Sequence, residues 1–226
     1  MKPIVVFGAG KIAEVLLYFY RNHSDRKVVA CTTDRDHLPP TPWNGLPAVP
    51  FDEVAAAYPP ATHDMFVALG YHDMNALRSQ KCAEARALGY ELPSYVHPQS
   101  GLPTDCEYGD NCFIMSQVLV HPRVKLGNNV FLWSGAMIGH HSVVGDNCWL
   151  TSCCNVSGVV TLGTNCFLAV NSTIAHAVRV GSDCFIGANA LVTRCTDDGE
   201  VYLAEASKPF RLNSRQFLRM SRFADL

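Results

Sequence analysis

From Leu126 the chain reads LGNNVF-LWSGAM-IGHHSV-VGDNCW, four six-residue units that end at Trp149 and share one pattern. Each unit begins with an aliphatic residue, often followed by glycine, and has a small residue in its fifth position. A period of six matches neither the 3.6 residues of a helix nor the two residues of a strand. It is typical of a β-helix built from hexapeptide repeats.

The same register continues in both directions without a slip, from Leu102 to the unit that begins at Ile186. Every unit begins with an aliphatic residue except the one at Tyr108. Each hexapeptide supplies one strand and one corner, so three of them complete a coil, and residues eighteen apart stack about 4.8 Å from one another. We therefore expect a triangular prism with the aliphatic residues inside and the glycines easing its corners.

Composition excludes several classes of function. The chain has 226 residues, a net charge of −2 and only 17% charged residues, which argues against a nucleic-acid partner. No apolar run approaches the ~18 residues of a transmembrane helix, so no membrane partner is expected. The first residues enter a strand pattern without a signal-peptide cleavage site, which predicts a cytoplasmic protein.

The ten cysteines do not form a metal or disulfide pattern. Six of them occupy the fifth position of the repeat, namely Cys106, Cys112, Cys148, Cys154, Cys166 and Cys184. A thiol in such a position packs as a small hydrophobic side chain. Because no CxxC pair is present, we expect structural thiols and no zinc site formed by cysteine.

Before the repeat, strand patterns alternate with helix patterns. Strands are expected at residues 4–7, 28–31, 65–69 and 92–96, and helices at 11–20, 51–58 and 72–88. This alternation predicts a small parallel sheet of Rossmann type. We expect the α/β domain to span residues 1–97, the β-helix 98–200, and a C-terminal tail and helix 201–226.

The N-terminal domain contains a candidate phosphate site. Gly8 and Gly10 flank a tight turn between the first strand and the first helix, where a helix N-terminus favours an anion. The third glycine of the dinucleotide fingerprint is missing. Asp34 ends the second strand, where a carboxylate can bind a ribose hydroxyl or simply cap a loop. Gly70 ends the third strand at the same edge of the sheet.

The whole layout resembles the NeuD/PglD-type bacterial nucleotide-sugar acyltransferases. The strongest local similarity is the segment 138–146, IGHHSVVGD, which is similar to the segment that contains their catalytic histidine. The resemblance implies a left-handed β-helix, a homotrimer, and acetyl-CoA bound between subunits. It implies His140 as the general base and the Gly158 amide as a donor to the thioester carbonyl. Imidazole suits the first role because it titrates near neutral pH.

The same resemblance, carried over position by position, implies further binding residues. Val170 and Ala188 would line the pantetheine channel, and Lys208 with Arg211 would meet the CoA phosphates. The nucleotide sugar would contact six residues of the N-terminal domain: Gly8, Gly10, Lys11, Asp34, Gly70 and Asp73.

Three departures from the family pattern bear on the site. The residue after the catalytic histidine is often acidic there and is His141 here. A second family histidine near the acetyl site aligns with Trp149, which predicts an altered acyl pocket. The usual C-terminal motif is reduced to residues 204–208, and the amphipathic pattern of residues 214–223 predicts an extra helix that packs against a partner subunit.

Three other functions are compatible with parts of the pattern. His140 and His176 are two coils apart, like a pair of zinc ligands in β-helical carbonic anhydrases, but the third ligand would be Gly181. A sugar or sialic acid O-acyltransferase would use the same base and donor. A non-catalytic trimeric scaffold would only bind the nucleotide sugar. The prediction that we carry forward is an acetyl-CoA-dependent, metal-independent N-acetyltransferase acting on a nucleotide-linked amino sugar, a 4-amino-4,6-dideoxyhexose.

Overall fold

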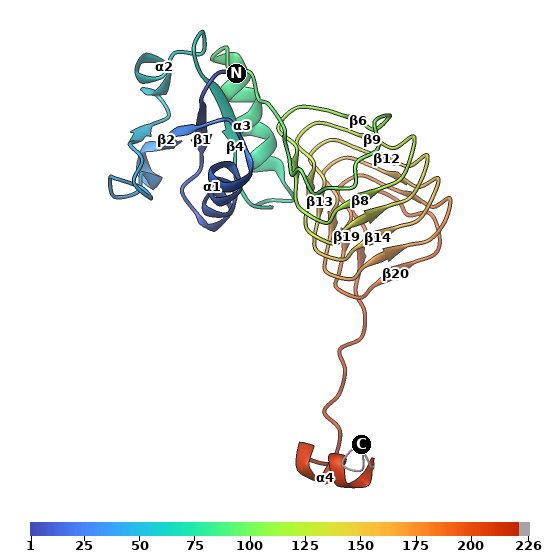
Figure 1. Ribbon diagram of the computed structural model, residues 1–226. Coiled ribbons are helices and arrows are strands. Elements are labelled where there is room, and N and C mark those ends of the chain that lie inside the picture. Colours follow the sequence, from blue (N-terminus) through green and yellow to red (C-terminus); the bar gives the residue numbers. More distant parts are fainter. Residues whose placement is uncertain (222–226) are drawn as a thin grey trace.

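The computed structural model describes residues 1–221 and contains an α/β domain, a β-helix and an extended C-terminal arm (Figure 1). The α/β domain and the β-helix lie side by side. The arm leaves the far end of the β-helix. This arrangement separates the candidate catalytic edge from the N-terminal pocket, as described below.

The N-terminal domain is a parallel sheet with helices around it. Its strands are β1 (Ile4–Phe7), β2 (Val28–Thr33), β3 (Ala48–Pro50) and β4 (Asp64–Val67), and its helices are α1 (Lys11–His23), a 3₁₀ turn (Arg35–His37), α2 (Val54–Ala57) and α3 (Ala76–Ala87). The strand order is β3-β2-β1-β4 and all pairings are parallel. Short apolar strands buried on both faces explain the run IVVF in β1.

The prediction that residues 92–96 form the fourth strand of this sheet is wrong. Strand β5 (Tyr95–Val96) pairs instead with β7 (Phe113–Ile114) of the β-helix, in the eighteen-residue register of the repeat. The fourth strand of the N-terminal sheet is β3, which lies in the proline-rich connector. Pairing between β5 and β7 makes the last residues before the repeat part of its first coil.

The β-helix consists of two-residue strands separated by corners. After β5 they are β6 (Glu107–Tyr108), β7 (Phe113–Ile114), β8 (Leu119–Val120), β9 (Lys125–Leu126), β10 (Phe131–Leu132), β11 (Met137–Ile138), β12 (Val143–Val144), β13 (Trp149–Leu150), β14 (Asn155–Val156), β15 (Thr161–Leu162), β16 (Phe167–Leu168), β17 (Thr173–Ile174), β18 (Arg179–Val180), β19 (Phe185–Ile186), β20 (Leu191–Val192) and β21 (Val201–Tyr202). They form one seven-stranded and two five-stranded parallel sheets. Every strand from β7 to β17 pairs with the strand eighteen residues further on, as Leu132 pairs with Leu150.

The interior of the prism is the predicted one. The first and fifth residues of the hexapeptides form a single buried cluster that includes Ile138 and Leu150. Tyr108 breaks the pattern in the structure as it does in the sequence, since it is exposed. Five of the six repeat cysteines are buried and Cys106 is half-buried, and burial raises the pKa of Cys112 to about 11. The five buried repeat cysteines pack as small apolar side chains, as predicted, whereas Cys153 and Cys195, outside the fifth position, are exposed.

The glycines of the repeat have a different role from the one expected. The left-handed corner residue is the fourth of the unit, and it is usually asparagine or another side chain, as at His141 and Asn147. Glycine at the second position is instead required by close contact between coils. A Cβ on Gly139 would lie 2.5 Å from the backbone nitrogen of Gly158 in the next coil.

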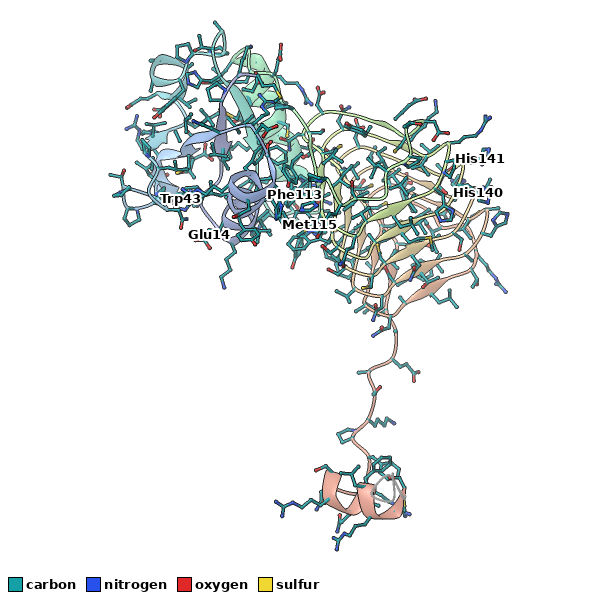
Figure 2. The ribbon with its side chains drawn as sticks, viewed as in Figure 1. Glu14, Trp43, Phe113, Met115, His140 and His141 are labelled. Atoms are coloured by element: carbon teal, nitrogen blue, oxygen red, sulfur yellow. The ribbon has the colours of Figure 1, made fainter. Side chains whose placement is uncertain are left out.

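The two domains share a second hydrophobic core. The outer face of the seven-stranded sheet presents a column of aromatic residues to α1 and the N-terminal sheet, and this column comprises Phe113, Phe131, Trp149 and Phe167. Neighbouring rings pack closely, with 5.6 Å between the ring centroids of Phe113 and Phe131. Figure 2 shows Phe113 and Met115 at this junction.

The C-terminal arm ends in a short helix, α4 (Ser214–Met220). Asn213 and Gln216 form a capping box that specifies the start of this helix. The predicted helix therefore begins as expected, and Phe223 lies outside the described residues. None of the helices in residues 1–221 has the length and apolar character needed to cross a membrane.

Candidate functional site

The candidate catalytic edge is a corner of the β-helix between its two five-stranded sheets. His140 follows β11, and Gly158 follows β14 one coil further on. His140 and His141 are both exposed. Figure 2 shows them on the side of the β-helix away from the N-terminal domain. This position leaves the His140 imidazole open to a ligand on the surface.

The His140 ring lies directly against Gly158. A Cβ added to Gly158 would be 2.7 Å from Nε2 and 2.8 Å from Cε1 of His140. Only glycine therefore permits the observed position of the ring. The sequence placed these two residues one coil apart, and the structure brings the imidazole and the backbone of residue 158 into contact.

His141 contacts the same imidazole through its other nitrogen, Nδ1. The Nδ1 atoms of His140 and His141 are 3.1 Å apart, so one ring donates and the other accepts. When His141 is the acceptor, the proton of neutral His140 is on Nδ1 and its Nε2 carries a free lone pair. A neutral imidazole can thus fix the tautomer of His140, although it lacks the charge of the acidic residue that the family pattern has at this position.

His176 lies on the same edge, one coil beyond Gly158. Its ring centroid is 6.4 Å from that of His140, with no side chain at position 158 between them. Within residues 1–221, no group of three or more His, Cys, Asp or Glu side chains is arranged to hold a metal ion. The incomplete histidine pattern of the sequence therefore stays incomplete among these residues.

A second candidate site is a cavity of about 560 Å³ at the carboxyl ends of β1, β2 and β4. Such an edge is where open α/β sheets bind ligands. The lining residues are Phe7, Gly8, Ala9, Gly10, Thr33, Asp34, His37, Pro39, Leu69, His72, Leu77 and Lys81. Three predicted residues are among them: Gly8, Gly10 and Asp34.

The two glycines serve the cavity in different ways. Gly8 has φ +124°, and a Cβ there would lie 2.8 Å from the carbonyl oxygen of Ala68. A Cβ added to Gly10 would have no neighbouring atom within 4 Å, and Gly10 immediately precedes α1. The turn is thus bare backbone at the start of a helix, which is suited to an anion.

Asp34 is held by a lysine that the sequence analysis missed. Lys81 Nζ donates to Asp34 Oδ1 at 2.7 Å and to Glu84 Oε2 at 2.9 Å. The hydrogen bond from Lys81 lowers the pKa of Glu84. Lys81 also lies 5.4 Å from the centre of the Phe7 ring. The cavity therefore contains a fixed pair of opposite charges.

The other predicted N-terminal residues lie beside the cavity and do not line it. Lys11 is exposed at the start of α1, and Asp73 is exposed in the loop before α3. The Gly70 carbonyl accepts from Arg78 instead of facing the cavity. His72 does line the cavity, and its place three residues beyond the end of the third predicted strand was a usable signal. No spacing in the sequence linked Lys81 to Asp34.

Within one chain, the residues expected to bind CoA lie at separate places. Val170 follows β16 at the corner between the seven-stranded sheet and a five-stranded sheet, and Ala188 occupies the same corner one coil on. This corner differs from that of His140 and Gly158. Lys208 and Arg211 are exposed on the extended arm, beyond the end of the β-helix.

Trp149, which the resemblance places near the acetyl site, does not lie at the His140 edge of its own chain. Trp149 is 2% exposed and lies between the domains, with its ring centroid 5.0 Å from that of Phe131. Strand β13 belongs to the seven-stranded sheet, which faces the N-terminal domain. Since successive hexapeptides turn the chain through successive faces of the prism, Trp149 and His140 of one chain lie at different places on it, and the altered acyl pocket stays a prediction.

Comparison with known proteins agrees with this architecture. Residues 105–140 and 160–194 match the model of the bacterial transferase hexapeptide family. The chain carries the hexapeptide repeat of bacterial transferases. No curated protein matches the chain significantly.

Three solved structures are similar over nearly the whole chain. PerB from Caulobacter crescentus, in complex with CoA and GDP-perosamine, is 25% identical with a TM-score of 0.80, over 89% of this chain and 93% of PerB. A mutant of the perosamine N-acetyltransferase from the same organism is 23% identical with a TM-score of 0.81, over 92% and 98% of the two chains. The acetyltransferase domain of PglB from Neisseria gonorrhoeae, with acetyl coenzyme A, is 22% identical with a TM-score of 0.80, over 92% and 99%.

These findings confirm the predicted fold class, an α/β domain followed by a left-handed parallel β-helix. They also confirm the resemblance to nucleotide-sugar acyltransferases of this hexapeptide-repeat type. The similarity covers both parts of the chain, so the α/β domain and the repeat occur together in the relatives as well.

Proposed function

We propose that this protein is an acetyl-CoA-dependent N-acetyltransferase that acts on the amino group of a nucleotide-linked amino sugar, a 4-amino-4,6-dideoxyhexose. The observation that carries the proposal is the similarity to PerB along both domains, because that structure holds CoA and GDP-perosamine. The cavity beside Gly8 and Asp34 and the exposed imidazole of His140 supply the two parts that such a reaction needs.

In the proposed mechanism, Nε2 of His140 takes the proton of the attacking amine, directly or through one water. The contact with His141 Nδ1 leaves that lone pair free when His141 is the acceptor. The backbone N–H of Gly158 stabilises the oxyanion that forms on the thioester carbonyl. The carbon–sulfur bond then breaks, and the CoA thiolate leaves with a proton from His140. No step requires a metal.

The nucleotide sugar is proposed to occupy the N-terminal cavity, with its diphosphate at the bare turn of Gly8 and Gly10. Asp34 and Lys81 then offer an acceptor and a donor to the nucleoside. Lys11, Gly70 and Asp73 remain proposed contacts that a bound ligand would have to reach from outside the cavity. For the domains we propose the division 1–97, 98–200 and 201–226.

We further propose a homotrimer in which one chain binds the acceptor and another supplies His140. The support is the position of the two sites, since the cavity lies in the N-terminal domain and His140 lies on the side of the β-helix away from it (Figure 2). Val170 and Ala188, at another corner, would then line the donor groove from a neighbouring chain, and Lys208 and Arg211 would reach CoA from the arm.

The oligomeric state can be checked by light scattering. Because each catalytic edge is proposed to be completed by a neighbouring chain, the purified protein should have three times the 24.8 kDa mass of one chain. A fully active monomer would contradict the shared site.

Asp34 provides a test of the acceptor site. Asp34→Asn should raise the acceptor KM about tenfold or more, because a charged hydrogen-bond acceptor is lost. The KM for acetyl-CoA should not change, since the donor groove is on the β-helix. Asp52→Asn is a matched control, because Asp52 pairs with Arg35 on the open surface at 2.7 Å. An effect of Asp34→Asn confined to the acetyl-CoA KM would contradict the assignment.

The reaction itself is tested by incubating the protein with acetyl-CoA and a panel of UDP-, dTDP- and GDP-linked 4-amino sugars, followed by mass spectrometry. We expect one panel member to gain a single acetyl group. A sugar O-acyltransferase is the second candidate, because the same histidine and donor would serve a hydroxyl. A second panel contains sugars with a hydroxyl in place of the amine. Acetylation of this second panel only would favour the O-acyltransferase, and no acetylated product from either panel would favour a binding scaffold.

A further inference from the structure

Arg78 is the most deeply buried charged side chain of the structure, and neither proposed site uses it. It lies on α3 and is 0% exposed. All five of its hydrogen bonds go to neutral oxygens: Asn129 Oδ1 (2.9 Å), Asn75 Oδ1 (2.9 Å), the carbonyls of Gly70 (3.3 Å) and Asn129 (3.3 Å), and the carbonyl of Asn147 (2.9 Å). In residues 1–221 no carboxylate forms an ion pair with it.

The guanidinium spans the boundary between the two domains. Gly70 and Asn75 belong to the N-terminal domain, whereas Asn129 and Asn147 are corner residues of the β-helix. Its carbon lies 4.4 Å from the centre of the Phe131 ring and 5.1 Å from that of Trp149. Burial lowers the pKa of Arg78 to about 10, so the group stays charged at neutral pH. Removing either its charge or its planar shape leaves buried acceptors without a donor.

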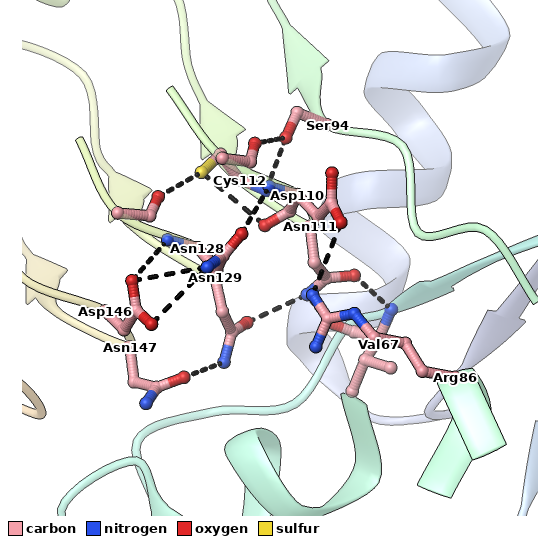
Figure 3. A network of polar contacts seen from close by, with 12 residues as sticks. Val67, Arg86, Ser94, Asp110, Asn111, Cys112, Asn128, Asn129, Asp146 and Asn147 are labelled. Carbon is pink, nitrogen blue, oxygen red and sulfur yellow. Dashed lines mark hydrogen bonds and ion pairs between the residues drawn. The ribbon is translucent and has the colours of Figure 1, made fainter. Parts of the chain in front are cut away.

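The β-helix side of this contact is a ladder of corner residues one coil apart. Side-chain hydrogen bonds of 2.8 to 3.0 Å connect them in the order Asn111, Asn129, Asn147, Asn165 and Asp183. The Asn111 amide also bonds both backbone groups of Val67, at the end of β4, with 2.8 Å to the nitrogen and 3.1 Å to the oxygen. Figure 3 shows Val67 joined in this way to the first rungs of the ladder. The β-helix thus presents this ladder of hydrogen-bonded polar side chains to the N-terminal domain.

The segment between β4 and α3 contacts this ladder and has an unusual backbone conformation. Asp73, Met74 and Asn75 have φ values of 48°, 46° and 70°, three successive left-handed residues without a glycine. Such a run persists only where surrounding contacts fix it. Here the Asn75 amide donates to the Asn165 carbonyl at 3.1 Å. The centroid of the Tyr71 ring lies 4.5 Å from that of the Phe167 ring.

The same segment and helix also form a wall of the N-terminal cavity. His72 lies between Tyr71 and the left-handed residues, and it lines the cavity. Lys81 is one helical turn beyond Arg78 on α3 and bonds Asp34 in the cavity. A shift of α3 away from the β-helix would therefore displace His72 and Lys81 together.

We infer that Arg78 is a positioning residue for the acceptor site, which sets His72 and Lys81 by fastening their segment to the β-helix. This inference rests on the proposed function, in which the cavity binds the nucleotide sugar. It adds that acceptor binding depends on a contact between domains that touches neither substrate.

The test compares two arginines of α3 that both reach the β-helix. Arg78→Lys keeps the charge but cannot make the planar set of bonds, and we expect the acceptor KM to rise about tenfold or more while the acetyl-CoA KM stays within about twofold. Arg86→Met removes an exposed ion pair with Asp110 at 3.6 Å, shown in Figure 3, and should leave both constants within about twofold. A purely structural role would lower the amount of active protein and leave both KM values unchanged, which would overturn the inference.

A second variant and a second measurement keep the test independent of folding and of activity. Asn75→Gly preserves the left-handed backbone but removes the bonds to Arg78 and Asn165, so it should reproduce the effect of Arg78→Lys on the acceptor KM. Hydrogen–deuterium exchange of residues 70–77 should increase in Arg78→Lys and Asn75→Gly, and not in Arg86→Met. If the wild-type protein acetylates no acceptor, the proposed function fails while exchange still tests the contact. Unchanged exchange of residues 70–77 in both variants would overturn the inference about Arg78.

Discussion

His140→Ala should lower turnover at least about a hundredfold, the usual loss when a general base is removed. The amine nucleophile must lose a proton as it attacks, and the His140 ring is the exposed imidazole that rests on Gly158. The proposed trimer should stay intact, because the His140 side chain is exposed and supports no part of the prism's core. Steady-state rates at saturating donor and acceptor, together with light scattering, provide the measurement.

Two other histidines make this result specific. His63→Ala is a control in the N-terminal domain, where His63 bonds Thr62 and lines neither site, and it should retain normal turnover. His176→Ala alters the other imidazole of the same edge. Near-normal turnover of His140→Ala, combined with a large loss in His176→Ala, would show that the base has been assigned to the wrong residue.

Gly158→Ala should lower turnover by about a hundredfold, although it removes no functional group. The new methyl carbon would stand 2.7 Å from Nε2 of His140, so the ring must move. A displacement of about 1 Å at a reacting group is enough for a loss of that size. The backbone of Gly158 needs no left-handed conformation, so the alanine variant should fold.

The double variant separates displacement from other causes. If alanine at position 158 acts by moving the imidazole, then His140→Ala/Gly158→Ala should be no slower than His140→Ala alone, because nothing remains to displace. If turnover of the double variant falls by the product of the two single losses, residue 158 acts on the substrate independently of His140.

The β-helix was predictable in detail because its period is strict. Once Leu132 and Leu150 are placed on the same face one coil apart, every other interior position follows, and the structure pairs these residues directly. The pairing of His140 with Gly158 follows from the same arithmetic. Periodicity also explained the cysteines, which would otherwise suggest metal or redox chemistry.

The errors arose where the periodic pattern meets the N-terminal domain. Residues 92–96 have the composition of a buried strand, but composition does not say which sheet a strand joins. Tyr95 pairs with Phe113 because they are eighteen residues apart, a relation visible only if the repeat is extended backward past His97. The alignment likewise did not indicate that Trp149 lies on the sheet that faces the N-terminal domain.

Contacts between distant segments could not be predicted at all. Lys81 meets Asp34 across 47 positions, and Arg78 meets Asn147 across 69. Neither pair has a sequence signature, because each depends on how α3 packs between the sheet and the β-helix. Arg78 looks like an ordinary exposed helix residue in the sequence, yet it is a buried link between the domains.

The most direct test of the account is the chemical linkage of the product. Wild-type protein and His140→Ala are incubated with acetyl-CoA and the responsive nucleotide amino sugar, and the product is analysed by mass spectrometry before and after treatment with mild hydroxylamine, which cleaves esters and spares amides. The account predicts a gain of one acetyl group that survives the treatment and forms at a greatly reduced rate in His140→Ala. An acetyl group that hydroxylamine removes, or one that His140→Ala transfers at the normal rate, would contradict it.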